Sequence, residues 1–444
     1  LNLLDRPAER GAIVIKTGLM IYDSFTRKQK TEPRHQFHNR SESLAKYPML
    51  NPQIKFTATY FDGEILSPER YCIDLIHDAM AEGDHAKALN YAQVEGISGE
   101  TVNIKDALTG ELLSIVPKVI VNAAGPWIDR VNSNFGLQEH YIGGTKGSHL
   151  VLDVPELRKA IGDHEFFFEN KDGRIVLILP FYDKVVVGTT DIQVEDIDDV
   201  VCTAEEEDYF LDLIARIYPA IKISRQDIVF RFSGVRPLEY VKAKTTGQIT
   251  RDHSIKRDNA LGIPVLSLVG GKWTSYRAFS EQAANEILSY LGILRVMGTA
   301  QLKVNGGEKY PRTEHEKRVF TELLAKETGI STEYANALFL RYGTYAKTAA
   351  DEINAISIAP LKSIENWTHG EVRWLIRNED VFHLEDLFLR RTTIAWLGNL
   401  TGEVLLEFAA IHADELGLSG SEKQAEILRT VALMDDRHGV KIVL

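Results

Sequence analysis

The spacing of apolar and polar residues divides the chain into three kinds of region. Residues 1–139 mix short apolar runs with helical patterns, and residues 140–254 are rich in strand-like runs with one helical pattern. From residue 308 onward the chain is almost wholly helical in period. The pattern predicts an α/β (α+β) fold with a sheet-based region inserted into a βα framework, followed by a C-terminal all-α domain.

Residues 264–291 show the clearest local pattern, which is that of a strand, a glycine turn and a helix. An apolar run at 265–269 is broken by two glycines, and helical spacing begins at Trp273. Such a turn presents unpaired N–H groups and the positive end of a helix dipole, to which Lys272 adds a cation and Thr274 a hydroxyl. An anion or an electron-rich ring could dock there, although the glycines could also serve only an ordinary βα connection.

A second strand leads into a turn of small residues. The strand predicted at 112–121 ends in NAAGPW, and a helix is predicted from Ile128. Ala124 and Gly125 carry almost no side chain, so a flat ligand could approach the backbone closely.

The remaining elements follow from shorter patterns. The polar stretch at 28–43 contains His35 and His38 without a third ligand nearby, so it favours a solvated loop over a metal site. We predict strands at 55–61, 87–93, 102–106, 176–179, 184–187 and 228–231, and helices at 68–83 and 204–218.

Length, charge and cysteine content narrow the class of protein. A chain of 444 residues predicts two or more domains, and its net charge of -12 argues against a nucleic-acid partner. Cys72 and Cys202 are too few for a disulfide framework or a thiolate metal site, which fits a reducing compartment. Apolar runs such as 175–181 are far shorter than the roughly 20 residues that span a bilayer. We therefore expect a soluble protein or one that lies on a membrane surface.

Several cations and imidazoles stand beside glycines. Arg236 lies between Gly234 and Pro237 at the end of a predicted strand, where its direction would be fixed for bidentate capture of a phosphate or carboxylate. His149 is at the start of an apolar strand, so it could be either a core histidine or a catalytic one. An unperturbed imidazole would titrate near pH 6.5. No metal site or catalytic triad is visible, which favours an organic cofactor. The whole set is Lys146, His149, Arg236, Arg251, His253, Lys272 and Arg277.

Six motifs occur in a fixed order: VNAAGPWID, KGSH, LPFYDKVVVGTTD, FSGVRPL, GGKWTSYR and EVRWLIRNEDVFHLEDLFLRRTT. Together they resemble the FAD-dependent glycerol-3-phosphate dehydrogenases and the related α-glycerophosphate oxidases, from about Ile13 to near Val431. The resemblance implies an FAD/NAD(P)-binding Rossmann-like domain interleaved with a sheet-based substrate domain, before the C-terminal all-α domain. It places an FAD-dependent oxidoreductase region at 1–304 and the helical domain at 305–444. Within the first, FAD-binding parts would be about 1–27, 63–139 and 255–304, and substrate-domain parts about 28–62 and 140–254.

The resemblance also implies a reaction, namely oxidation of sn-glycerol 3-phosphate to dihydroxyacetone phosphate with hydride passing from C2 to flavin N5. Electrons would leave to a quinone or to oxygen, in a cytoplasmic protein compatible with peripheral membrane association and a homodimer. Arg236, helped by Arg251, would hold the phosphate, His149 would be the base or hydroxyl orienter, and Lys272 would face flavin and substrate. The expected FAD contacts are Ala124, Gly125, Gly271, Lys272, Trp273 and Thr274.

The sequence departs from the family at one point. The family opens with a strand, a GxGxxG turn and a helix that hold the FAD pyrophosphate, and this sequence contains no such segment. We expect the complete protein to carry it upstream, and this chain alone to bind FAD weakly or not at all. A related flavin amine or amino-acid oxidase, and a non-catalytic scaffold, remain the alternatives.

Overall fold

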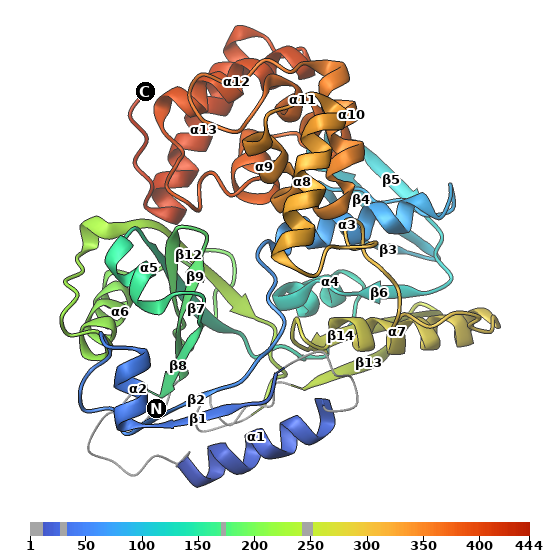
Figure 1. Cartoon of the computed structure of the whole chain (residues 1–444). Coiled ribbons are helices and arrows are strands. Elements are labelled where there is room, and N and C mark those ends of the chain that lie inside the picture. Colours follow the sequence, from blue (N-terminus) through green and yellow to red (C-terminus); the bar gives the residue numbers. More distant parts are fainter. Residues whose placement is uncertain (1–11, 27–32, 170–174, 242–251) are drawn as a thin grey trace.

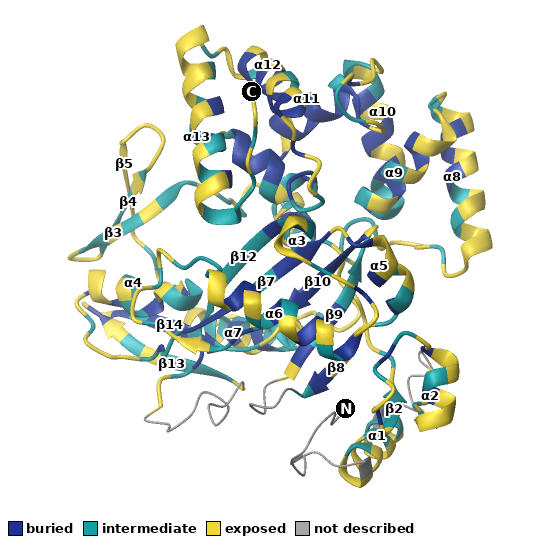
Figure 2. Cartoon of the chain, turned by 90° about the vertical axis from the view of Figure 1, so that its left-hand side faces the viewer, coloured by how far each residue is buried: buried dark blue, intermediate teal, exposed yellow. Residues whose placement is uncertain are grey.

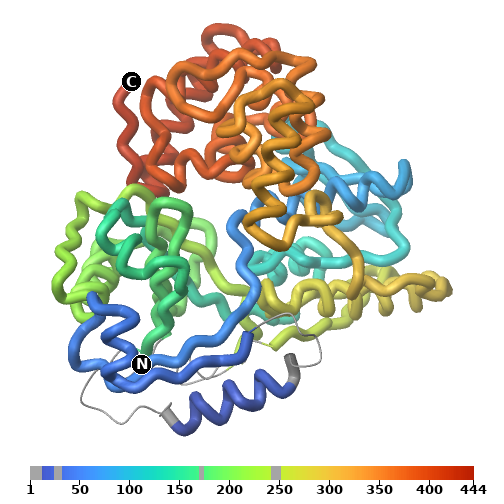
Figure 3. The backbone as a smooth tube through the Cα atoms, viewed as in Figure 1, coloured from blue at the N-terminus to red at the C-terminus, as the bar shows by residue number. Residues whose placement is uncertain are grey.

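The computed structural model describes residues 12–26, 33–169, 175–241 and 252–444. Two sheet-containing regions lie side by side, and a helical region made of the last third of the chain lies above both (Figure 1). The tube in Figure 3 follows the chain from the blue helix at the base to the red C-terminus at the top. None of the helices in the described ranges combines the length and hydropathy needed to cross a bilayer.

One region contains two small sheets. Strand β6 (Ile120–Asn122) runs parallel to β14 (Ile263–Gly270), and β13 (His253–Ala260) pairs with β14 antiparallel. Strands β3 (Ala92–Ser98), β4 (Thr101–Asp106) and β5 (Leu112–Ile115) form an antiparallel meander. The helices of this region are α3 (Pro68–Ala81), the short η1 (Gly125–Trp127), α4 (Ile128–Asn134) and α7 (Tyr276–Leu291).

The other region is built on a six-stranded antiparallel sheet around β7 (Thr145–Leu152). One edge of β7 pairs with β10 (Lys184–Gly188) and with the short β11 (Ile192–Gln193), and β12 (Ile228–Arg236) also pairs with β7 over most of its length. Beyond β10 lie β9 (Ile175–Phe181) and β8 (Phe166–Glu169). Helix α1 (Ala12–Thr26), the pair β1 (Gln36–Asn39) and β2 (Phe56–Thr59), and α2 (Arg40–Lys46) lie at the base (Figure 1).

The two faces of the six-stranded sheet are covered by different parts of the chain. Leu150 and Leu152 face a core that includes residues of α5 (Pro155–Ile161) and α6 (Ala204–Ile217). Val151 faces the other way and packs in the core of the C-terminal helices. The buried strands β7 and β10 stand out in dark blue between these layers (Figure 2). Further along β7, the face of Val151 carries His149 and Gly147 instead of apolar side chains.

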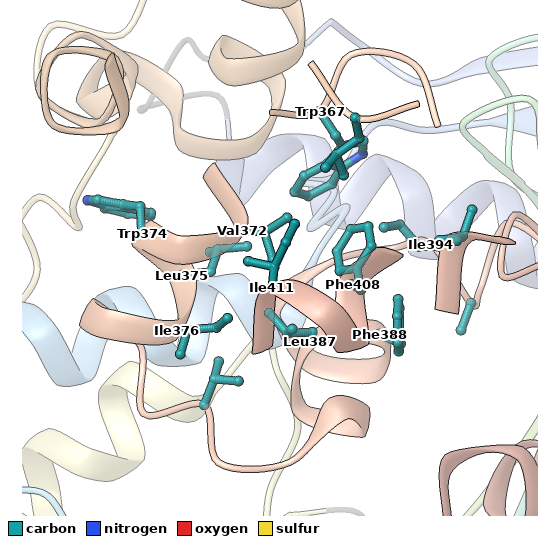
Figure 4. Packing of buried hydrophobic residues seen from close by; sticks show 14 of the residues in the cluster. Trp367, Val372, Trp374, Leu375, Ile376, Leu387, Phe388, Ile394, Phe408 and Ile411 are labelled. Atoms are coloured by element: carbon teal, nitrogen blue, oxygen red, sulfur yellow. The ribbon is translucent and has the colours of Figure 1, made fainter. Parts of the chain in front are cut away.

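The helical region has a large core of its own. Its elements are α8 (Glu314–Thr328), α9 (Thr332–Tyr342), η4 (Gly343–Tyr345), α10 (Ala346–Ile356), α11 (His369–Asn378), η5 (Asp386–Arg391), α12 (Gly402–Leu416) and α13 (Gly420–His438). Figure 4 shows the packing around Trp367, Leu375 and Phe408. Local sequence starts these helices, because Thr313 and Glu316 form a reciprocal capping box at α8 that contributes about 1 kcal/mol.

A buried ion pair joins this region to α3. Arg70 donates from Nη1 and Nη2 to the two carboxylate oxygens of Glu379, each at 2.5 Å. Arg391 lies 3.6 Å from the same carboxylate, and Tyr91 donates to Asp386 at 2.7 Å. Glu379 is the carboxylate that accepts both Nη donors of buried Arg70, whose other carboxylate, Asp74, lies 3.7 Å away on the same helix. Glu379 therefore fixes the helical region on α3.

Most of the predicted elements are present, and the exceptions have physical reasons. The solvated loop predicted at 28–43 is wrong in its described part, which contains β1 and the start of α2. There Asn39 forms a capping box with Glu42, and β1 pairs with a strand 20 residues away in register, Gln36 opposite Thr59. The strand predicted at 87–93 begins only at Ala92. Tyr91 has a φ of +53°, a conformation that ends regular extended backbone. The domain boundaries at 304 and within the first region stay a prediction.

Candidate active site

The two small-residue turns found in the sequence lie next to each other. β6 and β14 are parallel neighbours with Asn122 in register with Ser267, so the turns that follow both strands leave the same edge of the sheet. Asn122 organises the first turn, because its Oδ1 accepts from the Ala124 N–H at 3.1 Å and its Nδ2 donates to the Ile128 carbonyl at 2.9 Å. The carboxyl edge of adjacent parallel strands is where α/β proteins bind nucleotide cofactors.

The backbone of both turns requires glycine. Gly125 has a φ of +59°, and Gly270 and Gly271 have φ values of +76° and +95°. In the second turn the Ser275 hydroxyl accepts from the Lys272 N–H at 3.1 Å. Lys272 and Trp273 are exposed, the indole by 47%. Exposed groups at such a turn fit the edge of a flat aromatic cofactor, but the described residues include no glycine fingerprint for a pyrophosphate.

Strand β12 brings Arg236 to these turns. Arg236 is the last residue of β12, and the next carbonyl, that of Pro237, accepts from the Gly270 N–H at 3.1 Å. The guanidinium is held by the segment that follows β10. Its Nη2 donates to the Thr189 hydroxyl at 2.7 Å and to the Thr190 carbonyl at 3.2 Å. Its Nη1 lies 3.4 Å from Asp191, and the side chain stays 24% exposed.

Two glycines form a floor beneath the candidate side chains. A Cβ on Gly147 would lie 2.5 Å from Cζ of Arg236, and one on Gly188 would lie 2.6 Å from Nε2 of His149. Both side chains therefore lie flat on the backbone of the sheet. Gly147 is two positions from His149 on β7, and Arg236 is four positions from Phe232, which is the in-register partner of His149 on β12. Because side chains alternate along a strand, the cation and the imidazole share one face.

His149 is neutral at ordinary pH. Burial, and to a smaller extent the positive charge of Arg236, lower its pKa from 6.5 to about 4. The value near 6.5 given above for an unperturbed imidazole therefore does not apply to His149 in its buried place. Its Nδ1 is buried without a hydrogen-bond partner among the described residues, which leaves Nε2 as the nitrogen for a ligand. The ring itself stacks on Phe232.

The other cations of the sequence set have separate positions. Lys146 is buried on the opposite face, with Nζ 2.6 Å from Glu206, and His253 stacks on Phe279 at 4.4 Å. Arg277 is a surface cation bonded to Thr299 at 2.7 Å. Arg251 lies outside the described residues, so its predicted role is not placed.

Lys146 supports the site from behind. Burial opposes the charge of Glu206, but hydrogen bonds from Lys146 and Thr190 lower the pKa of this carboxyl, so it stays ionised. Thr190 donates to Glu206 at 2.6 Å, accepts from the Ser148 N–H at 3.0 Å, and offers its carbonyl to Arg236. Sequence reasoning missed this role of the GTTD segment, although the motif follows directly after a predicted strand.

A cavity of about 400 Å³ lies elsewhere, between α3 and the C-terminal helices. Arg70, Glu379 and Trp374 line it, together with Asp74, whose pKa burial raises to about 6 against the influence of Arg70. None of the candidate site residues lines this cavity. We therefore assign the chemistry to the glycine-floored face of the sheet, where cation, imidazole and turns converge.

Comparison with known proteins adds an independent line of support. A family model described as FAD-dependent oxidoreductase matches residues 8–259, and one described as the C-terminal domain of alpha-glycerophosphate oxidase matches 297–423. A glycerol-3-phosphate dehydrogenase of Synechocystis sp. is 30% identical in an alignment of 422 positions that covers 87% of this chain and 72% of that protein. An aerobic glycerol-3-phosphate dehydrogenase of Staphylococcus aureus is 28% identical, over 86% of this chain and 70% of that protein.

The solved structure of a glycerol-3-phosphate dehydrogenase from Bacillus halodurans, complexed with FAD, has a similar fold. The TM-score is 0.73 at 23% identity, over 90% of this chain and 79% of that chain. The likeness confirms the predicted fold class, an FAD-type α/β region with an inserted sheet and a C-terminal helical part.

Proposed function

Because this chain belongs to the FAD-dependent oxidoreductase family, we propose that it oxidises sn-glycerol 3-phosphate to dihydroxyacetone phosphate with FAD as the cofactor. The names of its relatives support this substrate. One structural observation carries the proposal, which is that Arg236 and His149 lie on one sheet face beside the two small-residue turns. An anion-binding cation and a neutral proton acceptor are what the oxidation of a phosphorylated alcohol requires.

In this proposal Arg236 binds the phosphate. A guanidinium is a charged donor to a phosphate, and the bonds of Nη2 to Thr189 and Thr190 fix the position of the side chain before the substrate arrives. Arg251 is the proposed second cation. The partial charge balance by Asp191 keeps the guanidinium from attracting any anion indiscriminately.

His149 takes the proton from the C2 hydroxyl through Nε2 while C2 gives up its hydrogen as hydride, so the C–O bond becomes a carbonyl. FAD, when bound, supplies the hydride acceptor. A pKa of about 4 makes the imidazole available as a neutral acceptor at pH 7, though a weak one. A phosphate dianion at Arg236 counteracts the smaller of the two causes of that low pKa, so substrate binding makes His149 more basic.

The exposed turns would hold the flavin. We assign contacts to its ring system to Ala124 and Gly125 in the first turn and to Gly271, Trp273 and Thr274 in the second. Lys272, which is exposed at the same turn, would lie at the border of flavin and substrate. The pyrophosphate needs a cradle of backbone N–H groups that the described residues do not provide.

The electron acceptor and the location are a further part of the proposal. We infer that the electron acceptor is a quinone or oxygen and that the protein is cytoplasmic and lies against a membrane surface. The segment after α7 supports surface contact, because Leu294, Val296 and Met297 are 87%, 99% and 66% exposed. A homodimer is compatible with this arrangement.

Anaerobic addition of glycerol 3-phosphate to the FAD-loaded protein tests the function. The flavin absorption should bleach with this substrate and persist with glycine or sarcosine. Bleaching by an amine and not by glycerol 3-phosphate would establish the amine-oxidase alternative. No bleaching by any of them, with flavin bound, would favour a non-catalytic protein.

A further inference from the structure

A line of aromatic rings runs from the candidate base into the C-terminal helical region. The His149 imidazole stacks on Phe232 with ring centroids 4.6 Å apart and planes 4° from parallel. Phe232 lies 4.8 Å from Trp396, whose indole N–H donates to the Leu389 carbonyl at 3.1 Å. Trp396 stands between η5 and α12, so the far end of this line is held by the helical region.

The imidazole depends on these ring contacts for its orientation. Its Nδ1 has no hydrogen-bond partner among the described residues, so no polar contact at that nitrogen fixes the ring plane. Gly188 on β10 lies under the ring so closely that a Cβ would meet Cγ of His149 at 2.8 Å, and Phe232 covers it in a parallel stack. A ring held by its faces keeps its position only while both neighbours keep theirs.

We propose that the C-terminal helical region positions the His149 imidazole, with Trp396 acting through Phe232. Trp396 packs against Phe232 with its plane at 59° and against Phe230 at 4.8 Å, so it blocks the rotation that would release the stack. The catalytic consequence rests on the proposed function. The geometric part of the proposal, that Trp396 fixes the position of the imidazole, does not depend on the proposed function.

The helical region is firmly attached to the strand through which it would act. His438 of α13 stacks on Phe230 at 4.4 Å and bonds the Arg231 carbonyl through Nδ1 at 2.8 Å. Arg231 donates back to the Gly439 carbonyl at 3.2 Å. Close to Trp396, a Cβ on Gly398 would meet Cβ of Val229 at 2.8 Å, so the backbone of the region lies directly against β12.

The electrostatic surroundings give this positioning a measurable signature. Arg236 on β12 is the charged group beside the imidazole, and it is itself paired with Asp191. Burial is the larger cause of the low pKa of His149. Release of the ring toward solvent would therefore raise that pKa toward its ordinary value, whereas a general loss of stability elsewhere would not change it.

Trp396→Leu tests the inference, with Trp367→Leu as the matched control. Trp367 lies in the same helical core, with its ring against Phe408 (Figure 4). The first measurement is NMR titration of the imidazole resonances of the cofactor-free chain, with His149 assigned by comparison with His149→Gln. In Trp396→Leu we expect loss of the ring-current shift from Phe232 and a His149 pKa higher by about one unit or more.

The second measurement is flavin reduction in the FAD-loaded enzyme. Trp396→Leu should slow reduction at saturating substrate on the order of tenfold to a hundredfold, as for a small misplacement of a catalytic group, with little change in substrate affinity. Trp396→Phe, which keeps a smaller aromatic ring, should change the rate and the His149 resonance in the same direction but less, so it still tests the inference if the leucine variant does not fold. Trp367→Leu should lower the melting temperature and leave the His149 resonance and the reduction rate unchanged.

Two results would overturn the inference. Unchanged His149 resonances in both Trp396 variants would show that the imidazole does not depend on the helical region. Equal displacement in the Trp367 control would reduce the effect to general destabilisation. If glycerol 3-phosphate fails to reduce the flavin while the His149 resonance still moves in Trp396→Leu, the positioning stands and the proposed function fails.

Discussion

Replacement of Gly147 by alanine tests whether the position of the Arg236 side chain matters for activity. The added Cβ would lie 2.5 Å from Cζ of Arg236, well inside van der Waals contact, so the guanidinium has to leave its place. The clash is with the end of a long side chain, which can move. The φ of Gly147 is not in the left-handed region, so the backbone accepts alanine. The substitution therefore displaces a cation without removing it.

The size of the effect follows from the contacts that are lost. Arg236 would give up its bonds to Thr189 and Thr190 together with the aligned contact to the phosphate. A charge-assisted hydrogen bond contributes roughly 1.5 to 3 kcal/mol, which corresponds to about a tenfold to a hundredfold loss in kcat/KM. Stability should fall by only about 1 to 2 kcal/mol, because alanine in place of glycine restricts the unfolded chain and offsets part of the loss.

The assay is anaerobic flavin reduction over a range of glycerol 3-phosphate concentrations, with FAD content and melting temperature measured on the same samples. Gly420→Ala is the control, since nothing lies within 4 Å of a Cβ at this exposed helix terminus. Gly147→Ala in an Arg236→Ala background should cost nothing further, because the two changes act on one contact. Losses that multiply in the double variant, or full activity in Gly147→Ala, would refute this account of the glycine floor.

Three further expectations concern pH, cofactor and attachment of the helical region. The acid limb of flavin reduction should lie below pH 6.5, and above the pKa of about 4 of the substrate-free protein because bound phosphate offsets the charge of Arg236. Stopped-flow rates across pH should show no such limb in His149→Asn, and a limb unchanged by the substitution would remove His149 as the base. The His149 imidazole of the unfolded chain binds a proton below about pH 6.5, whereas that of the folded protein binds one only near pH 4. The free energy of unfolding should therefore fall by on the order of 3 kcal/mol as the pH is lowered from 6.5 to 4, and melting curves of His149→Asn should lack this decline. This chain alone should take up little FAD in equilibrium dialysis, whereas stoichiometric tight binding would mean that the GxGxxG segment is dispensable. Glu379→Ala should cost about 3 to 5 kcal/mol in denaturant unfolding, because buried Arg70 loses the carboxylate that accepts both of its Nη donors and keeps only the longer contact to Asp74 among the described residues. Removal of Glu286 from the exposed Arg257 should have little effect, and equal effects of the two changes would contradict the anchoring role of Glu379.

Elements determined by neighbouring residues could be predicted from the sequence. α3 begins at Pro68 and is followed by Gly83 with a φ of +139°, which are the start and stop signals that the sequence displays. β1 could not be predicted in this way, since three of its four residues are polar and it exists only through pairing with β2. The start of β3 was misplaced because the apolar pattern at 87–93 does not reveal the positive φ of Tyr91.

The residues of the candidate site likewise fall into those that the sequence predicts and those that depend on contacts between distant segments. Arg236 at a strand end and the turns at Ala124 and Gly271 could be predicted, because strand ends and glycines can be recognised in the sequence. The residues that support Arg236 could not be predicted. Gly147 is 89 positions away in the sequence and lies against Arg236 only because β7 pairs with β12. The pairing of Lys146 with Glu206 likewise arises only once α6 packs behind the sheet.

The register of β12 on β7 ties the site to the attachment of the helical region. Phe230 lies opposite Val151 in the core shared with the helices, and the same alternation places His149 opposite Phe232 on that face. A shift of β12 by one residue would turn Phe230 and Phe232 toward the core formed with α5 and α6, and would move Arg236 to the face opposite His149. The pairing register of β12 with β7 is irregular between Ile228 and Phe230, at the end of this strand pair that is nearer the C-terminal helices. Packing of apolar residues against the C-terminal helices therefore selects the register in which cation and imidazole face the turns, so the helical region contributes to the site without supplying a residue that touches the substrate.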